Sequence, residues 1–375
     1  MSDSWTIARL SDVLSEISDR AGKQNLDVLS VTEKRGIIPQ SDVFNRRIAT
    51  EDISDYKVLE PLDIAFNPYL LWAGAIGQWM GETRGVVSPV YPCFRAKESE
   101  NSRWLGLVFE SAVLRPYFDS TAIGSIVRRR RTTIPVFLNA ELQRPPRSVQ
   151  NRIVDVISSV DSYIAALQQQ ADAARVARSA VLSELLSAGG EDWIEMTIES
   201  FARLVPGKYI PKSKYEENGS YFIYGSNSVM GKYSTALIDV PHVVMAAIGA
   251  YAGAVRYSSQ PSWVNNNAFG LVTNDNVDPF FFYLWLEQCL DLRQVVVGTG
   301  QPYVQRPALK NTVVNVPPVK EQRRIVDIVS SLDEVFSSTE RAIIEAKRLR
   351  SGLLSDLLSG HHEIPESYDQ LLGAA

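Results

Sequence analysis

The sequence predicts an α+β fold in which two mixed α/β domains are separated by two long helices that pack on each other. Two observations lead to this fold class. A segment of 45 residues that begins at Arg144 recurs without a gap at Val316, and the two copies are identical at 18 positions. Each copy also carries apolar residues at alternating spacings of three and four for about four heptads, which is typical of coiled-coil helices. This internal repeat is the strongest signal in the chain.

Both copies have the start and stop signals of a helix. A proline pair stands near each start, at Pro145 and Pro317, where proline is tolerated because the first helical amides have no intrahelical partner. Glycine follows the last apolar positions, at Gly189 and Gly360, and glycine commonly ends a helix. The repeated segments are therefore predicted to be long, uninterrupted helices.

The residues predicted to line the contact between the helices follow a spacing of three and then four. Members of this stripe are Ile153, Val160 and Leu167 in the first copy and Ile325, Leu332 and Leu349 in the second. Because the stripe has the same register in both copies, we expect the helices to pack on each other, and alanines in the middle permit a close approach. Two ordinary core helices are the alternative interpretation.

The rest of the chain forms two divergent domains with a shared order of features. "WTIARLSDVL" is similar to "MTIESFARLV", which pairs Trp5 with Met196, and "LLWAGAIGQW" and "GAYAGAVRY" both suggest a strand–Gly–strand passage. A short amphipathic helix aligns Glu110 with Glu287, 177 residues apart, whereas the long helices are 172 apart. The first domain thus has five extra residues, which we place in a loop around Arg128–Arg131. The predicted order is a domain over 1–143, a helix over 144–190, a domain over 191–315, a helix over 316–360 and a tail over 361–375.

Composition narrows the class of protein. The chain has 38 basic and 43 acidic residues and a net charge of −5, which excludes a globally basic nucleic-acid coat but not local basic patches. Two cysteines, Cys93 and Cys289, are too few for a disulfide framework or a structural zinc site and fit a reducing compartment. No secretory signal and no apolar run of membrane-spanning length is visible, so we expect a cytoplasmic protein.

Several stretches of the second half carry a family resemblance. The segment from Val316 to Gly360 resembles the helical region of the specificity subunits of type I restriction–modification systems. Four further stretches resemble the same family: "YGSNSVMGKY" from Tyr224, "AAIGAYAGAVRY" from Ala246, "SWVNNNAF" from Ser262 and "GTGQPYVQ" from Gly298. The first half is similar in its helix and more loosely in its globular part.

This resemblance implies a function. The two domains would be target-recognition domains that each read one half of a split, asymmetric sequence in double-stranded DNA. The two helices would form an antiparallel coiled-coil spacer that docks two methyltransferase (M) subunits, and whether restriction/translocase (R) subunits join the complex stays open. The chain itself would need no cofactor, because S-adenosylmethionine is expected in the methyltransferase subunit. The alternative is a non-catalytic coiled-coil scaffold that recruits protein partners without reading DNA sequence.

The residues themselves give no complete catalytic or metal site. "FNPYL", from Phe66, is similar to the N-P-P-Y motif of adenine methyltransferases but lacks one proline, so Asn67-Pro68 is interpreted as a turn. No G-x-x-x-x-G-K-[ST] loop for a nucleotide is present. The three histidines do not suggest a metal site or a catalytic triad. We therefore predict a protein without catalytic residues, whose activity resides in partner subunits.

Basic, aromatic and amide side chains in loops are the candidate DNA contacts. Lysines and arginines suit phosphates, and asparagines can pair with adenine edges in the major groove. The candidates are Arg128, Arg129, Arg130, Arg131, Lys208, Tyr209, Lys212, Lys214, Asn265, Asn266, Asn267, Gln301 and Tyr303. Each has a simpler alternative: a solvated loop for the basic residues, a turn for the three asparagines, and a structural role beside the second helix for Gln301 and Tyr303.

Overall fold

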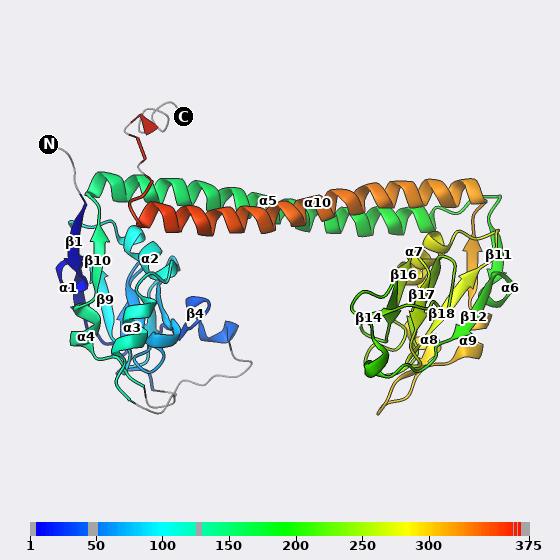
Figure 1. Cartoon of the computed structure of the whole chain (residues 1–375), viewed down its shortest axis with the longest axis horizontal. Coiled ribbons are helices and arrows are strands. Elements are labelled where there is room, and N and C mark those ends of the chain that lie inside the picture. Colours follow the sequence, from blue (N-terminus) through cyan, green and yellow to red (C-terminus); the bar gives the residue numbers. More distant parts are fainter. Residues whose placement is uncertain (1–4, 44–51, 125–129, 363, 366, 369–375) are drawn as a thin grey trace. The chain divides into compact units, whose positions relative to one another are not determined.

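The computed structural model describes residues 5–43, 52–124, 130–362, 364, 365, 367 and 368. The chain forms two compact units. Unit 1 contains Met1–Ala166 and Ala342–Ala375, and unit 2 contains Leu167–Arg341. Two long helices, α5 (Arg147–Ser187) and α10 (Val319–Leu358), each contribute one part to each unit (Figure 1). None of the helices in the described part of the chain is long and apolar enough to cross a bilayer.

The long helices begin and end where the repeat predicts. Each starts directly after its proline pair, and a glycine in the left-handed region follows each end, Gly189 with φ +62° and Gly360 with φ +73°. In unit 1 the first part of α5 packs with the last part of α10, and Ile153, Ile157 and Leu354 share one core. In unit 2 the last part of α5 packs with the first part of α10. The two helices are therefore antiparallel in both units.

Five of the six named residues of the predicted stripe are buried or half-buried. Ile153 and Ile325 are buried, and Val160, Leu167 and Leu332 are half-buried. Leu349 is 65% exposed, however, so its assignment to the contact between the helices is wrong, and its neighbour Arg350 takes the inward position.

The order of the three- and four-residue steps explains this error. Buried positions in α5 run from Ile153 to Ile157 and then to Ile164, a step of four where the prediction has three, and Tyr163 is 58% exposed. In α10 the buried residues beside the predicted stripe include Val329 and Ile343. Apolar residues occupy both adjacent positions at several of these sites, so hydrophobicity alone does not choose between the two phases.

The globular part of unit 1 is built from small sheets and helices. β1 (Thr6–Arg9) pairs with β10 (Glu141–Arg144). One four-stranded sheet has the order β2 (Leu14–Ile17), β9 (Cys93–Ala96), β6 (Ile64–Phe66), β7 (Ile76–Gln78), and another has the order β4 (Gly36–Pro39), β3 (Asp27–Thr32), β8 (Gly85–Val87), β5 (Lys57–Leu59). The helices are α1 (Leu10–Val13), α2 (Ser102–Glu110), α3 (Arg115–Thr121) and α4 (Ile134–Leu138), with two short 3-10 helices at Gln40–Asp42 and Leu71–Ala73.

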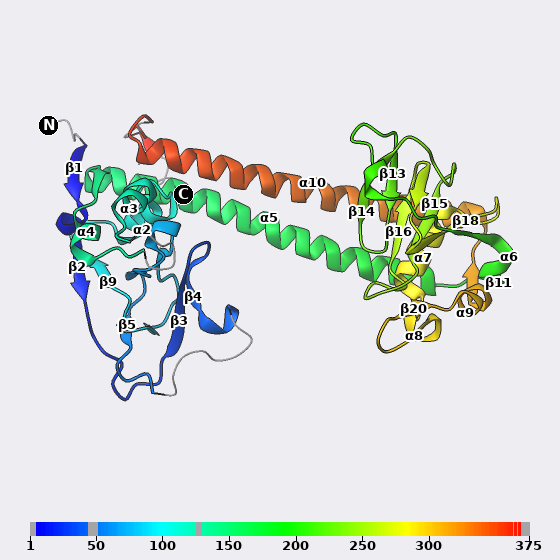
Figure 2. The ribbon, with the colours of Figure 1, turned by 60° about the horizontal axis from the view of Figure 1, so that its bottom comes forward.

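The globular part of unit 2 repeats this plan. β11 (Ile194–Thr197) pairs with β21 (Val313–Val316). The four-stranded sheet has the order β12 (Ala202–Pro206), β18 (Ala268–Thr273), β15 (His242–Ala246), β16 (Val255–Ser258). Two smaller sheets contain β14 (Val229–Tyr233), β13 (Tyr221–Tyr224) and β17 (Ser262–Val264), and β19 (Val296–Val297) with β20 (Tyr303–Val304). The helices are α6 (Ile198–Phe201), α7 (Pro279–Cys289), α8 (Leu292–Val295) and α9 (Arg306–Asn311), with a 3-10 helix at Lys212–Lys214; α7 packs on β15 and β16 (Figure 2).

Strand pairing corrects the alignment of the two domain starts. Thr6 lies opposite Arg144, and Ile194 lies opposite Val316. Since Arg144 and Val316 are equivalent positions of the repeat, Thr6 corresponds to Ile194, and Trp5 corresponds to Trp193 rather than to Met196. The shared Thr-Ile dipeptide misled the sequence comparison by three residues, because it lies in β1 in unit 1 but at the start of α6 in unit 2.

The strand–Gly–strand passage is confirmed in both units. β6 and β7 flank Gly74 (φ +104°), and β15 and β16 flank Gly253 (φ +89°). The extra residues of the first domain also lie where predicted. The starts of α3 and α8 are 177 residues apart, whereas those of α4 and α9 are 172 apart, so the added length falls between α3 and α4.

Candidate nucleic-acid interface

Unit 2 brings the predicted lysine loop next to the asparagine turn. The amide of Lys208 donates to the carbonyl of Val264 at 2.9 Å, and the indole of Trp263 donates to the carbonyl of Lys208 at 2.9 Å. Gly207 lies so close to this turn that an added Cβ would be 2.0 Å from the carbonyl oxygen of Asn265. The loop over 207–215 and the turn over 265–267 are therefore one packed substructure.

The third predicted segment joins the same edge through the end of β15. The amide of Ala247 donates to the carbonyl of Asn267 at 2.8 Å, and the carbonyl of Ala247 accepts from the amide of Val304 at 2.9 Å. Gly249 donates to the carbonyl of Pro302 at 2.8 Å. Gln301 and Tyr303 consequently lie beside the asparagine turn at one edge of the domain.

Most candidate side chains at this edge face solvent. Tyr209 is 70% exposed, and the other exposed candidates are Lys208, Lys212, Lys214, Asn266, Asn267, Gln301 and Tyr303. In the described part of the chain none of the three lysines forms an ion pair. The edge thus offers uncompensated positive charge, an aromatic ring and free amides together.

Asn265 differs from its two neighbours. It is buried, its side-chain oxygen accepts from the amide of Asn266 at 2.6 Å, and its side-chain nitrogen contacts the sulfur of Met230 at 3.5 Å. The Asn265 side-chain amide therefore bonds within the turn, as the turn-forming alternative predicts for this residue. Asn266 and Asn267 are the asparagines whose side chains are exposed.

Unit 1 has the same edge with different residues. The amide of Thr132 donates to the carbonyl of Pro68 at 2.9 Å, and the amide of Asn67 donates to the carbonyl of Ala75 at 2.9 Å. These bonds match those from Val304 to Ala247 and from Ala246 to Ala254 in unit 2. The segment that leads to Thr132 therefore occupies the place of the segment that leads to Val304. Arg130 and Arg131, the described arginines of the cluster, are thus the topological equivalents of Pro302 and Tyr303.

The two described arginines of the cluster have different surroundings. Arg130 forms an ion pair with Asp119 at 2.7 Å, and its guanidinium lies 4.8 Å from the ring centre of Trp72. Arg131 is exposed, and its backbone forms a bridge with Ile123. Arg128 and Arg129 lie outside the described residues. Arg131 is thus the described arginine whose charge is available at this edge.

The stretch similar to a methyltransferase motif is a turn. The amide of Tyr69 donates to the side-chain oxygen of Asn67 at 3.0 Å, and the amide of Leu70 donates to the Asn67 carbonyl at 3.1 Å. A side chain that closes its own turn in this way explains the Asn-Pro pair.

Two groups with catalytic potential, His242 and Cys93, are buried. The imidazole Nδ1 of His242 donates to the carbonyl of Val240 at 2.7 Å, so its Nε2 accepts from the hydroxyl of Ser262 at 2.8 Å. Both residues are fully buried, and burial lowers the pKa of His242, which keeps the ring neutral. Burial likewise raises the pKa of Cys93 to about 12. Among the described residues no group of three or more His, Cys, Asp and Glu side chains is arranged to hold a metal ion.

A hollow of about 310 Å³ beside α2 and β7 distinguishes unit 1. Gln78, Arg103 and Gly106 line it, and the equivalent positions in unit 2 are Tyr257, Phe280 and Tyr283. The Phe280 ring lies 4.8 Å from that of Tyr257 and 5.6 Å from that of Tyr283, measured between centres, so aromatic rings occupy this region in unit 2. No histidine, cysteine or serine lines the hollow among the described residues.

Comparisons with known proteins agree with the fold. Residues 190–348 match the model of the "Type I restriction modification DNA specificity domain" family. The MjaVIII type I restriction enzyme specificity subunit of Methanocaldococcus jannaschii is 20% identical over 411 residues, which cover 96% of this chain and 93% of that protein.

Three solved structures share the fold over nearly the whole chain. The type I restriction–modification S subunit from M. genitalium has a TM-score of 0.58 at 14% identity, covering 97% of this chain and 98% of its own. A structure described as showing complex assembly and conformational transition of a type I R-M system has a TM-score of 0.63 at 15% identity, with 94% and 97% covered. The HsdS subunit from Thermoanaerobacter tengcongensis has a TM-score of 0.51 at 17% identity, with 96% and 98% covered.

The fold and the sequence matches lead to one assignment. The family model covers the second recognition domain and most of α10, and the archaeal relative aligns along almost the entire chain. Residues 190–348 are a type I restriction modification DNA specificity domain, and the chain resembles type I specificity subunits along nearly its whole length, which supports a function in DNA specificity.

Proposed function

We propose that each globular domain reads one half of a bipartite DNA sequence through the edge just described, and that α5 and α10 dock two methyltransferase subunits. The observation that supports this most is the topological equivalence of two unlike segments. Both the segment before Thr132 and the segment before Val304 close the same edge by the same backbone bond. One is rich in arginine, and the other carries glutamine and tyrosine. Equivalent edges with different side chains suit a reader of two different half-sites.

The chemistry of the unit 2 edge fits DNA in two ways. Lys208, Lys212 and Lys214 are exposed and unpaired in the described chain, so they can neutralise phosphates and release counterions. Asn266 and Asn267 carry exposed amides, which can pair with the N6 and N7 atoms of adenine in the major groove. Phosphate contacts set the position of the domain, and amide contacts set its base preference.

The chemistry of the unit 1 edge differs. Arg131 is exposed, and the Arg130 side chain is held between Asp119 and the Trp72 ring. A guanidinium presented by a loop suits a phosphate or a narrow minor groove. Because unit 1 and unit 2 offer different donors, the two half-sites would differ in sequence, which makes the whole site asymmetric.

Methyl transfer belongs to the partner in this proposal. The Asn67-Pro68 stretch closes a turn, and His242 and Cys93 are buried. The partner methyltransferase subunits would bring S-adenosylmethionine and the acceptor site for the target base. Restriction subunits would join the same assembly where the system has them. The working place of such a complex would be the cytoplasm.

A domain exchange tests the division of labour. The complex is assembled with its methyltransferase subunits, residues 191–315 are replaced by the equivalent domain of a relative, and methylated sites are mapped over a whole genome. We expect one half of the methylated sequence to change and the other half to stay. A change in both halves would show that the domains do not read independently.

Salt dependence separates a DNA reader from a protein scaffold. For a phosphate-contacting surface, log K falls with log salt by about 0.9 for each phosphate neutralised. The double variant Lys212→Ala/Lys214→Ala should therefore reduce this slope by roughly two, with base preference unchanged. Lys320→Ala, which removes an exposed lysine at the start of α10, is the matched control. A scaffold that does not read DNA would show no sequence preference at any salt concentration.

A further inference from the structure

Arg350 joins three elements of unit 1. Its Nε and Nη2 atoms donate to the carboxylate of Asp161 on α5, with 2.9 Å from Nη2 to Oδ2. Its Nη1 atom lies 2.8 Å from Oε1 of Glu110, the last residue of α2. The Arg350 side chain is only 15% exposed. One guanidinium on α10 thus connects both long helices to the globular domain.

Arg178 makes the same three-way contact in unit 2 with the helices exchanged. Its Nε and Nη2 atoms donate to Asp333 on α10, with 3.3 Å from Nη2 to Oδ2, and its Nη1 atom donates to Oε2 of Glu287 on α7 at 3.2 Å. The Arg178 side chain is 21% exposed. The corresponding nitrogen atoms have corresponding partners in the two units. The repeat therefore preserves a specific geometry and not only a helix pattern.

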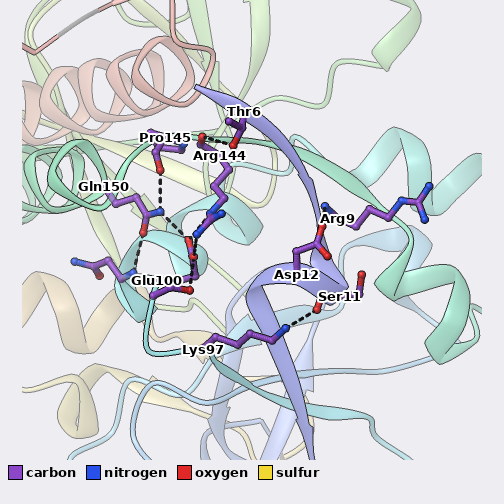
Figure 3. Close-up of polar contacts among 11 residues, drawn as sticks. Thr6, Arg9, Ser11, Asp12, Lys97, Glu100, Arg144, Pro145 and Gln150 are labelled. Carbon is purple, nitrogen blue, oxygen red and sulfur yellow. Dashed lines mark hydrogen bonds and ion pairs between the residues drawn. The ribbon is translucent and has the colours of Figure 1, made fainter. Parts of the chain in front are cut away.

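The opposite ends of α2 and α7 are held by a second pair of equivalent residues. In unit 1 the buried Gln150 side chain accepts from the amide of Asn101 at 2.8 Å and donates to the carbonyl of Pro145 at 3.0 Å and to Glu100 at 2.7 Å. Figure 3 shows this cluster, in which Arg144 also donates to Glu100. Asn101 is the residue whose side chain caps α2.

Gln322 does the same at the start of α7. Its side-chain oxygen accepts from the amide of Asp278 at 2.7 Å, and its nitrogen donates to the carbonyl of Pro317 at 2.8 Å and to that of Asn276 at 2.9 Å. Asp278 caps α7 as Asn101 caps α2. In each unit one short helix is consequently fixed at its first turn by one long helix and at its last turn by the other.

We propose that these residues are positioning residues: the glutamine and arginine contacts hold α2 and α7 at both ends, and thereby fix the direction in which each recognition domain presents its DNA edge. We call the two sets the clasps, with Gln150, Glu110, Asp161 and Arg350 in unit 1 and Gln322, Glu287, Asp333 and Arg178 in unit 2. The inference rests on the proposed function, because it assigns the clasps a role in reading DNA.

The positions of the contacts suggest that the clasps orient each domain and do not merely attach it to the long helices. A single point of attachment leaves a helix free to swing about it, whereas two points at opposite ends define its axis. Arginine suits the shared contact, because its planar fork can bind one carboxylate with two nitrogens while a third nitrogen reaches another. Apolar packing alone would hold the domain without defining its direction as sharply, since such packing is non-directional.

The test removes the domain-side contact and leaves the contact between the helices. Glu110→Gln and Glu287→Gln retain size, and both glutamates are partly exposed, so neither change leaves a fully buried charge without a partner. Each variant is assembled with the methyltransferase subunits. Methylation is then measured on DNA substrates in which the distance between the half-sites is the native one or differs by one base pair. Glu345→Gln, at an exposed position of α10, is the matched control.

We expect the wild-type complex and the control to prefer the native distance sharply. In Glu110→Gln and Glu287→Gln the ratio of methylation at altered to native distance should rise about tenfold, the effect of roughly 1.4 kcal/mol of lost orientation. Base preference within each half-site should stay unchanged. A purely stabilising role would lower the melting temperature and reduce methylation at all distances equally.

Two results would overturn the inference. An unchanged ratio in both variants would mean that the clasps do not set direction, and an altered base preference would mean that they act through the recognition loops. Failure of the proposed function has a different signature, since the wild-type complex itself would then show no preference for sequence or distance.

Discussion

Replacing Gly207 by alanine tests whether the lysine loop and the asparagine turn act as one reading surface. An alanine Cβ at this position would lie 2.0 Å from the carbonyl oxygen of Asn265 and 2.5 Å from that of Ala268. Both obstructing atoms belong to the backbone, so no side chain can rotate away. The loop has to retreat by about an ångström or more, since non-bonded carbon and oxygen atoms need more than about 3 Å.

The cost and its consequence follow from this displacement. Overpacking of this kind costs about 1–3 kcal/mol, which for a unit of this size lowers the melting temperature by roughly 2–12 °C. The displacement also strains the bond from Lys208 to Val264, and it shifts the neighbouring Tyr209. Recognition of the half-site proposed for unit 2 should weaken, whereas unit 1 should keep its base preference at the other half-site.

The assay compares Gly207→Ala with Gly300→Ala. Gly300 belongs to the same edge, has no atom within 4 Å of the place that a Cβ would take and has no positive φ, so alanine fits there. With the assembled complex, kcat/KM for the native site should fall about tenfold in Gly207→Ala, and base preference should relax in one half-site only. Gly300→Ala should match the wild type. If Gly207→Ala loses melting temperature yet keeps the wild-type rate and base preference, the loop over 207–215 is not part of the reading surface.

Three further outcomes are expected. Ile325→Ala, at a fully buried position, should cost about 2–5 kcal/mol of unfolding free energy in urea melts, whereas Leu349→Ala should cost less than about 0.5; equal costs would contradict the helix phase described above. Because burial lowers the pKa of His242, the unfolded chain binds the imidazole proton more readily than the folded chain does, so the contribution of this residue to stability is present above about pH 6.5 and is lost as the pH falls. The difference between the melting temperatures at pH 7.5 and pH 5 should therefore be smaller in His242→Gln than in the wild type. An equal difference would show that other groups titrate. The purified chain without partners should transfer no methyl group from labelled S-adenosylmethionine to DNA, and adenine methylation by the chain alone would refute the assignment of catalysis to a partner.

The repeat made the long helices and the domain order predictable. Proline pairs and glycines mark local backbone geometry, which depends on nearby residues only, and α5 and α10 begin and end beside them. The strand–Gly–strand passage was predictable for the same reason, since the left-handed conformations at Gly74 and Gly253 favour glycine. The added length between α3 and α4 followed from simple spacing.

The helix phase and the roles of single polar residues were not predictable, because both depend on tertiary contacts. At Val156 and Ile157 either side chain could face inward by hydrophobicity, and the choice is made by what the partner helix and the domain present. The inward place of Arg350 depends on Asp161, a distant residue in the sequence. Burial of Asn265 likewise depends on Met230 and on the approach of Gly207. A pattern of one residue type cannot reveal such pairs.

The two halves differ at the edges proposed to meet DNA and agree at the residues by which each domain contacts the helices. Gln150 and Gln322, Asp161 and Asp333, Arg178 and Arg350, and Glu110 and Glu287 are identical between the halves and make matching bonds. The edges carry arginines in one half and lysine, asparagine and glutamine in the other. Aromatic rings in unit 2 also replace the hollow that lies beside α2 in unit 1. One of these rings belongs to Tyr283, which donates to Oε1 of Glu287 at 2.8 Å. The bond from Arg178 uses the other oxygen, Oε2, so both bonds are made together. The residues that attach each domain to the long helices are thus distinct from those proposed to contact DNA, so a recognition loop can change its base preference without altering the clasp that orients the domain.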